Sequence, residues 1–319
     1  MLALQVIDLV QKAFQRAGLE ANLFPYGAIP TAYEQGIIEV VPDCQSRTAL
    51  GEVADGGLYD IFMREYGAPG SPAFESARQN FLRSCAGYAV ATYLLQAKDR
   101  HNGNLLIRKD GSLVHIDFGF ILEISPGGNM KFESAGFKLS HDMTQLIDPG
   151  APCWASVRRG SDPGRGSRPL PATQALLTGL RFDFTAFRAA SVRAGRRHKS
   201  PEYHQFLDLC VRGYLVARSI AEDIIAVVGL MQHSGLPCFG HGKVRERVQL
   251  TVPPRLARPP AHWPGPRPQP MPNLRKRFRL DLSNRQAAQF FKRVVQDAYD
   301  KTSTKYYDII QQLQNGYPH

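Results

Sequence analysis

Two short stretches hold the residues whose types and spacing could do chemistry. Residues 98–104 read Lys-Asp-Arg-His-Asn-Gly-Asn, and residues 115–119 read His-Ile-Asp-Phe-Gly. Phosphoryl transfer asks a protein for a polar group beside the attacking hydroxyl and for oxygen ligands that hold Mg²⁺ against the nucleotide phosphates. Carboxylate and amide oxygens suit this cation. The groups of these kinds are Asp99, His101, Asn104 and Asp117.

The pattern is more specific than its parts. Asp-Phe-Gly alone is a weak signal, because a strand followed by a glycine turn accounts for it. Asp-Arg-His-x-x-Asn followed 13 residues later by Asp-Phe-Gly is a strong one. Protein kinases order the triplet His-Arg-Asp and place four residues before the asparagine. The reversed order and the shorter spacing here indicate a different class of kinase.

A hairpin is expected to bring the two stretches together. Lys109-Asp110-Gly111 is a turn signal between two apolar runs, so we expect strands at Asn104–Ile107 and Leu113–Phe118. Their pairing would place Asn104 beside Asp117.

The rest of the chain is mostly helical by its apolar periodicity and capping residues. We expect helices at Leu2–Leu19, at about 71–95, from Ser200, at Ile220–Met231 and from Ser283, and two further strands at Asn22–Ala28 and Gly36–Val41.

The formal charge of +11 is concentrated in two segments. Residues 150–199 carry a net +8 and residues 241–272 a net +5, which leaves −2 for the remainder. Both segments are rich in Pro, Arg and Gly and lack periodicity, so we interpret them as solvated insertions and not as a nucleic-acid-binding tail. Translated non-coding sequence would have the same bias, and retained introns are a second hypothesis.

The five cysteines are widely spaced and form no C-x-x-C pair, which favours a reduced, intracellular protein. The longest apolar runs are too short to span a bilayer. Contact with a membrane would therefore be peripheral.

The reversed triplet resembles the phosphatidylinositol 3-/4-kinase superfamily. Further text narrows the resemblance to the alpha form of the type III phosphatidylinositol 4-kinases: Leu-Gln-Val-Ile-Asp-Leu (4–9), Phe-Pro-Tyr (24–26), Gly-Ile-Ile-Glu-Val-Val (36–41), Ser-Pro-Gly-Gly-Asn (125–129) and Gly-Leu-Pro-Cys-Phe (235–239). The likeness covers the chain outside the two charged segments.

This resemblance implies an α+β, protein-kinase-like fold, mainly the helical C-lobe with a remnant of the N-lobe sheet. The implied division is an N-lobe remnant at 1–43, C-lobe with catalytic loop and activation segment at 44–149, an insertion at 150–199, C-lobe helices at 200–240, an insertion at 241–272 and C-terminal helices at 273–319.

The resemblance also assigns roles. Glu39, Val40 and Val41 would form the hinge whose backbone binds adenine, Asp99 and His101 would flank the inositol hydroxyl, and Asn104 and Asp117 would bind Mg²⁺. Which of Asp99 and His101 is the base stays open, and His115 is expected to be a satisfied structural residue.

The charge of the activation segment, residues 118–143, indicates which lipid headgroup it accepts. Its cations are Lys131 and Lys138, which we expect at the lipid headgroup, whereas a headgroup with extra phosphates would call for an Arg/Lys cluster. The implied reaction moves the ATP γ-phosphate to the inositol 4-hydroxyl of phosphatidylinositol, at a cytoplasmic membrane face, the plasma membrane by resemblance. Regulatory subunits are left open.

The sequence before Phe24 contains no motif that matches the family's phosphate-covering loop or its ATP-binding lysine. We therefore expect little kinase activity from these 319 residues alone. Two alternatives stay open: a non-catalytic remnant that binds partners or lipid, and a protein kinase of the related large-kinase family.

Overall fold

A computed structural model describes residues 1–32, 35–53, 57–125, 136–149, 199–239 and 269–300 of the chain. Lys131, Ser-Pro-Gly-Gly-Asn beyond Ser125 and nearly all of both proposed insertions lie outside these ranges. The described part is mostly helical and contains a two-stranded and a three-stranded antiparallel sheet. The expected α+β class, mainly helical with a small sheet content, is confirmed at the level of secondary structure.

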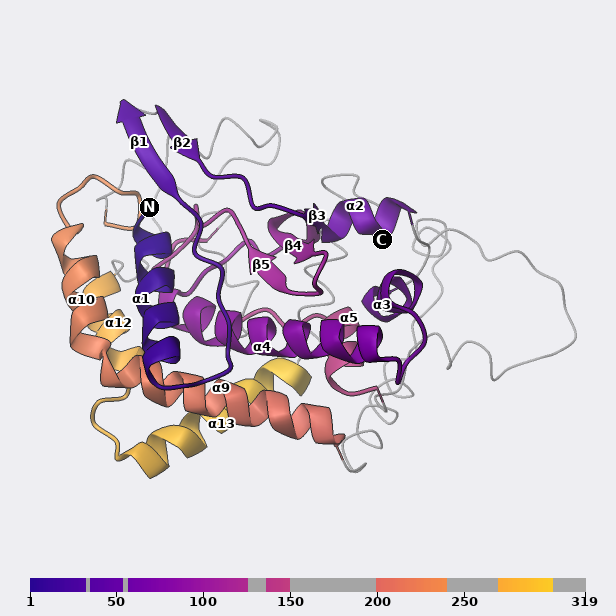
Figure 1. Cartoon of the computed structure of the whole chain (residues 1–319). Coiled ribbons are helices and arrows are strands. Elements are labelled where there is room, and N and C mark those ends of the chain that lie inside the picture. Colours follow the sequence, from indigo (N-terminus) through magenta and orange to yellow (C-terminus); the bar gives the residue numbers. More distant parts are fainter. Residues whose placement is uncertain (33–34, 54–56, 126–135, 150–198, 240–268, 301–319) are drawn as a thin grey trace, which may run out of the picture.

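Helix α4 (Pro72–Leu95) is the centre of the structure (Figure 1). Ser71 begins it as the cap that accepts the Phe74 N–H at 3.3 Å, with proline in the first turn. Helices α1 (Leu2–Arg16) and α9 (Pro201–Ser219) pack on α4, and α13 (Asn284–Asp300) packs on α9. All of these helices were expected from periodicity.

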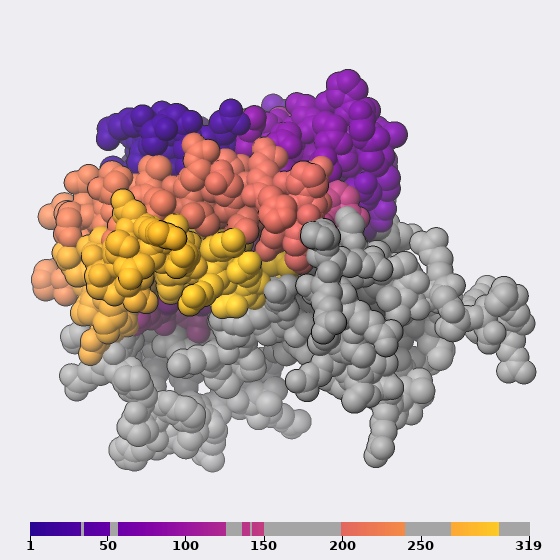
Figure 2. Space-filling model, turned by 90° about the horizontal axis from the view of Figure 1, so that it is seen from below, coloured from indigo at the N-terminus to yellow at the C-terminus, as the bar shows by residue number. Residues whose placement is uncertain are grey.

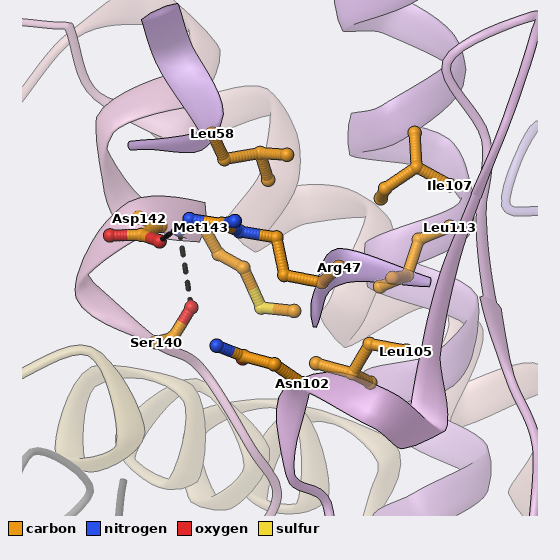
Figure 3. A pocket seen from close by; sticks show the side chains of 9 residues that line it. All are labelled: Arg47, Leu58, Asn102, Leu105, Ile107, Leu113, Ser140, Asp142 and Met143. Atoms are coloured by element: carbon orange, nitrogen blue, oxygen red, sulfur yellow. Dashed lines mark hydrogen bonds and ion pairs between the residues drawn. The ribbon is translucent and has the colours of Figure 1, made fainter. Parts of the chain in front are cut away.

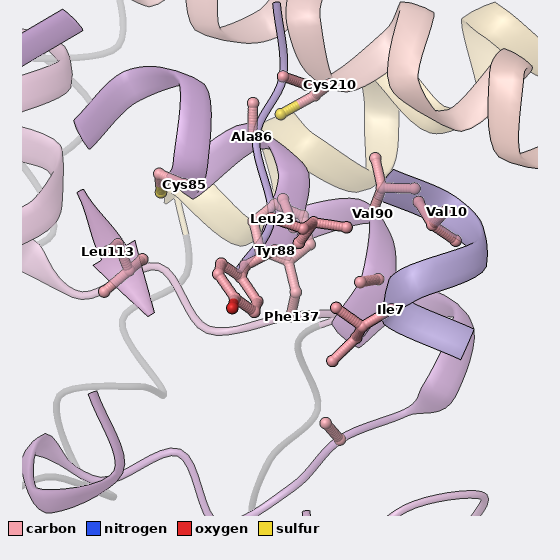
Figure 4. Close-up of a cluster of buried hydrophobic side chains, with 14 of the residues drawn as sticks. Ile7, Val10, Leu23, Cys85, Ala86, Tyr88, Val90, Leu113, Phe137 and Cys210 are labelled. Atoms are coloured by element: carbon pink, nitrogen blue, oxygen red, sulfur yellow. The ribbon is translucent and has the colours of Figure 1, made fainter. Parts of the chain in front are cut away.

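The core lies where α1, α4 and α9 meet (Figure 4). Ile7 and Val10 from α1, Val90 from α4 and Cys210 from α9 are fully buried there. Each apolar side chain buried in this way contributes roughly 1.5–3 kcal/mol. This packing fixes α4, and α4 in turn is followed at its C-terminal end by the loop of residues 98–104.

The second sheet is joined to another face of α4. It consists of β3 (Cys44–Ser46), β4 (Leu105–Arg108) and β5 (Leu113–His115), paired in that order. The Leu113 N–H donates to Ser84 Oγ at 2.8 Å. Gly111 has φ +85°, and a Cβ there would lie 2.5 Å from the Ala77 carbonyl oxygen. The predicted hairpin is confirmed, and its turn requires glycine for both reasons.

The end of the second hairpin strand differs from expectation. The strand stops at His115 and not at Phe118, because Asp117 has φ 55° and so leaves the extended region.

The predicted strand at 22–28 is wrong. The first sheet is β1 (Ala28–Ala32) paired with β2 (Gln35–Ile38). The chain before Ala28 instead bonds to helices: the Asn22 N–H donates to the Arg83 carbonyl at 3.0 Å, and the Leu23 N–H to Gln11 Oε1 at 2.7 Å. Apolar β-rich residues indicated burial here, but tertiary bonds took the place of a strand ladder.

Shorter helices complete the fold: α2 (Arg47–Val53), α3 (Leu58–Tyr66), α5 (His141–Ile147), α10 (Ala221–Leu230) and α12 (Pro270–Arg277). Of these, only α10 was predicted. Because α12 begins at Pro270, three residues assigned to the second insertion belong to a helix. Figure 2 shows residues 199–239 (salmon) and 269–300 (yellow) side by side on one face.

The residues on either side of the first insertion are in contact with each other. The Ser200 N–H donates to Asp148 Oδ1 at 3.2 Å, and Ser200 Oγ donates to the Ile147 carbonyl at 3.3 Å. The start of α9 is therefore in contact with the end of α5, although 51 residues lie between Asp148 and Ser200 in sequence.

Candidate functional site

The expected catalytic loop, residues 98–104, follows α4 closely and runs beside the start of the expected activation segment. Gln96 ends α4 in the left-handed region, with φ 47°. The Lys98 N–H then donates to the Phe120 carbonyl, and the Leu122 N–H donates to the Leu95 carbonyl, each at 2.8 Å. Two backbone bonds thus hold the Asp99 loop and the Asp117 loop side by side.

Arg100 ties these two loops together from inside. Its side chain is 1% exposed. Nε donates to the Lys98 carbonyl at 2.9 Å, Nη1 to the Ile116 carbonyl at 2.6 Å and Nη2 to the Asp117 carbonyl. The guanidinium lies 5.2 Å from the centre of the Phe118 ring. Sequence reasoning gave this residue no role, although its place inside the triplet was a signal.

Asp99 and Asp117 share an unusual backbone conformation, with φ values of 62° and 55°. Residues other than glycine occupy this region rarely, and such strain clusters at functional sites. Each carbonyl is bonded in the motif: Asp99 accepts from Asn104 Nδ2 at 2.9 Å and Asp117 from Arg100. The conformation of both aspartates is therefore set by residues of the two motifs themselves.

The two expected Mg²⁺ ligands lie next to each other along the hairpin. The Ile116 N–H donates to the Asn104 carbonyl at 3.1 Å, which places Asp117 one residue from that bond. Asn104 is 6% exposed. Its amide nitrogen is engaged by Asp99, so its side-chain oxygen is the atom left for a cation. The Asp117 carboxylate is solvent-exposed and accepts the Gly119 N–H at 3.1 Å.

His101 caps the short 3-10 turn η1 (Asn102–Asn104). Its Nδ1 accepts the Gly103 N–H at 3.1 Å. A neutral imidazole that accepts at Nδ1 carries its proton on Nε2. In this geometry His101 presents an N–H donor at Nε2.

The expected hinge leads to the site through Tyr26. The Glu39 N–H donates to the Gly27 carbonyl at 2.8 Å, and Glu39 Oε2 accepts the Gly27 N–H at 2.6 Å. Val40 is 84% exposed, whereas Val41 is buried. Tyr26 is buried against the Asp117 backbone, and burial raises the pKa of its hydroxyl. Tyr26 thus connects the hinge strands to the Asp117 loop, a contact that sequence reasoning missed.

His115 lies beneath the site as a structural residue. It is 2% exposed and stacks on Tyr88, with ring centres 4.5 Å apart and planes 7° apart. Burial, and then the charges of Arg100 and Lys138, hold the pKa of His115 well below 6.5. Its Nδ1 has no hydrogen-bond partner within the described residues. The residue is neutral and structural as expected, but it is not fully satisfied.

Lys138 is buried near His115 and is 8% exposed. This position offers little surface to a lipid headgroup. The segment that follows is anchored through α5, because Arg47 Nη2 bonds to Asp142 Oδ2 at 2.7 Å. Arg47, Asn102, Ser140 and Asp142 line one small pocket between α2, the catalytic loop and α5 (Figure 3). The expected catalytic loop and the end of the expected activation segment therefore line the same pocket.

Within the described ranges, no helix is both long and apolar enough to cross a bilayer.

Comparison with known proteins assigns these features to a family. Residues 1–153 match the family model described as Phosphatidylinositol 3- and 4-kinase. The chain is 48% identical to phosphatidylinositol 4-kinase alpha 1 of Arabidopsis thaliana over 316 residues and 45% identical to alpha 2 of the same plant over 316 residues. It is 35% identical to phosphatidylinositol 4-kinase stt4 of Schizosaccharomyces pombe over 319 residues.

These matches cover 99–100% of this chain but only 12%, 45% and 13% of the respective relatives. Residues 1–153 contain both motifs of the site. Residues 1–153 therefore match a phosphatidylinositol 3- and 4-kinase domain, and the chain is a homologue of the catalytic domain of the alpha-type phosphatidylinositol 4-kinases.

Proposed function

We propose that this chain supplies the catalytic centre of a phosphatidylinositol 4-kinase, which transfers the γ-phosphate of ATP to the inositol 4-hydroxyl of phosphatidylinositol. The observation that carries the proposal is the joining of the Asp99 and Asp117 loops by Arg100. That arrangement gathers two carboxylates, an imidazole and an amide at one end of α4, which is the set that phosphoryl transfer requires.

The donors present fit Mg²⁺. Asn104 and Asp117 offer one amide oxygen and one carboxylate, and Mg²⁺ commonly takes one or two protein oxygens beside phosphate and water. Within the described residues, no group of three or more His, Cys, Asp or Glu side chains could hold a metal ion. Phosphate and water would therefore complete the coordination of the cation. When bound, the cation would neutralise charge that develops on the phosphates.

We assign different roles to Asp99 and His101. The Gly103 N–H occupies His101 Nδ1, so the Nε2–H is suited to donate to the transferring phosphoryl group. Acceptance of the hydroxyl proton then falls to the Asp99 carboxylate. Under this assignment His101→Gln, which keeps a neutral N–H donor, retains more activity than Asp99→Asn. The reverse order would identify His101 as the base.

Adenine binding belongs to the Glu39–Val41 stretch in this proposal. Because the Glu39 N–H is already donated to Gly27, the remaining backbone groups of the stretch would contact the base. Residues 1–43 would then belong to an N-lobe, and the α4-centred helices to the C-lobe of a kinase-like fold.

Unmodified phosphatidylinositol is the favoured lipid. Two of the acidic residues in 118–143 are engaged by arginines, Glu123 by Arg277 and Asp142 by Arg47. Headgroup contact by Lys138 would require its side chain to leave a buried position, and Lys131 lies outside the described residues. Because the sequence of this segment contains two lysines and no arginine, it offers little positive charge for additional ring phosphates. Binding would be peripheral, at a cytoplasmic membrane surface.

The test is a lipid kinase assay on the purified full-length native protein, which includes any sequence that flanks these residues. Vesicles contain phosphatidylinositol, its 4-phosphate or its 4,5-bisphosphate, and the labelled product is identified by chromatography. We expect phosphatidylinositol 4-phosphate from the first vesicles alone and no product with Asp117→Asn. Transfer to a peptide in preference to lipid would favour a protein kinase. ATP binding without turnover would favour a binding module.

A further inference from the structure

Glu123 has a conformation that local sequence does not account for. It lies six residues after Asp117, at the start of the activation segment. Leu122 and Glu123 have φ values of 51° and 80°. Two successive residues other than glycine seldom adopt positive φ, and such a conformation persists only where the surroundings hold it.

Helix α12 supplies what holds it. The Gln269 N–H donates to Glu123 Oε2 at 3.1 Å, and Asn273 Nδ2 donates to Oε1. Arg277 Nη2 forms an ion pair with Oε1 at 3.6 Å. The donors are the backbone N–H of the N-cap residue of α12 and two side chains four residues apart on one side of that helix, about 150 residues further along the chain. The Glu123 carboxylate is thus bound at several points by α12.

Arg277 links this contact to the catalytic loop. It is 6% exposed, and its Nη1 donates to the carbonyl of Leu94 at 2.7 Å, at the end of α4. Burial lowers the pKa of Arg277 to about 10, against the opposing effect of Glu123, so the guanidinium stays charged at neutral pH. One buried cation therefore contacts the helix before the catalytic loop and the segment after Asp117.

We propose that Glu123 is a positioning residue through which α12 sets the direction of the activation segment where it leaves the Asp117 loop. This inference rests on the proposed lipid kinase function. Glu123 lies six residues after the expected Mg²⁺ ligand Asp117, within the segment that is expected to meet the headgroup. Its loss should therefore impair phosphorylation of lipid more than binding of ATP.

The experiment compares Glu123→Ala, Arg277→Met and the double variant with the unaltered protein at native length. The matched control is Glu222→Gln, because Glu222 makes a bidentate pair with Arg275 on the exposed side of α12. Among the described residues, it has no hydrogen bond or ion pair with the activation segment. Initial rates are measured over a range of phosphatidylinositol concentrations in vesicles and a range of ATP concentrations.

We expect Glu123→Ala and Arg277→Met to lower kcat/KM for phosphatidylinositol at least tenfold and to leave KM for ATP within twofold. The double variant should lose less than the product of the two single losses, because the two substitutions share the Glu123–Arg277 contact. Glu222→Gln should stay within twofold in both quantities. A parallel change in KM for ATP, or unchanged lipid phosphorylation in Glu123→Ala, would overturn the proposal.

Hydrogen exchange gives a readout that does not depend on turnover. Amides of 118–125 should exchange at least tenfold faster in Glu123→Ala than in Glu222→Gln, at equal thermal stability. Should Arg277→Met fail to fold, Asn273→Ala takes its place with the same expected direction. Unchanged exchange would refute the α12 contact itself, whereas an unaltered protein without lipid turnover would refute the proposed function.

Discussion

Replacement of Arg100 by methionine tests the central contact of the site. Methionine keeps an unbranched apolar stem in a position that is 1% exposed, so the main change is loss of the guanidinium. That group donates to the carbonyls of Lys98, Ile116 and Asp117. The variant leaves these three acceptors buried without this donor and removes the link between the two loops.

The magnitude follows from those three bonds. A hydrogen bond to a charged group contributes roughly 1.5–3 kcal/mol, and three such bonds do not add fully. Release of a buried charge offsets part of the loss. We therefore expect the free energy of unfolding to fall by about 3 kcal/mol. Since Asp117 loses its fixed carbonyl, the Mg²⁺ concentration for half-maximal activity should also rise.

Urea unfolding followed by circular dichroism measures the stability, and the Mg²⁺ dependence of the initial rate measures the effect on the site. The matched control is Arg64→Met, because Arg64 is 40% exposed in a surface pair with Glu65 and should change stability by about 0.5 kcal/mol or less. If Arg100→Met lowered the free energy of unfolding by less than about 1 kcal/mol, its effect would be comparable with that of a surface ion pair. Such a result would refute the reasoning.

Three further predictions follow from the packing. Gly87→Ala should destabilise the protein by about 2 kcal/mol or more, because its Cβ would lie 2.3 Å from the Asn22 carbonyl oxygen; chemical unfolding measures this. The lowered pKa of His115 means that the unfolded chain binds its proton first, so stability should fall as pH drops below 6.5. His115→Phe, which can still stack on Tyr88, should reduce this pH slope in unfolding curves collected from pH 7.5 to about 5. Replacement of residues 150–198 by a short Gly-Ser linker should leave the Tm within about 3 °C, because the chain is already in contact across this segment.

Each of these has its own control. Gly229→Ala, in helix α10, places a Cβ at an ordinary 3.5 Å from Met271, so it should be neutral or stabilising by about 1 kcal/mol. If the two glycine variants behaved alike, the close approach of Asn22 would not be the cause. A pH slope that persists in His115→Phe would assign it to another group. Loss of cooperative unfolding on removal of 150–198 would show that the segment is part of the fold.

Local sequence predicted the elements whose signals are local. Ser71, Ser200 and Ser283 cap helices at or beside the positions where their patterns indicated a start, since a cap needs only neighbours three residues away. The turn at Gly111 was predicted for the same reason. Stretch 22–28 was predicted wrongly as a strand, because its bonding partners lie on α1 and α4.

The candidate site divides in the same way. Asp99, His101, Asn104 and Asp117 were proposed from residue type and spacing, because phosphoryl transfer limits which groups can serve, and their catalytic roles stay a prediction. The burial of Lys138 was not foreseen, since exposure of a lysine depends on what packs over it.

The sequence by itself determined which chemistry is proposed for this protein, because two motifs 13 residues apart carry the candidate groups and a hairpin turn joins them. Tertiary structure alone decided how those groups are held. Arg100 became the tie between the loops only when three carbonyls converged on it. Glu123 found its partners on α12, about 150 residues away, and no local pattern specifies a contact over that separation.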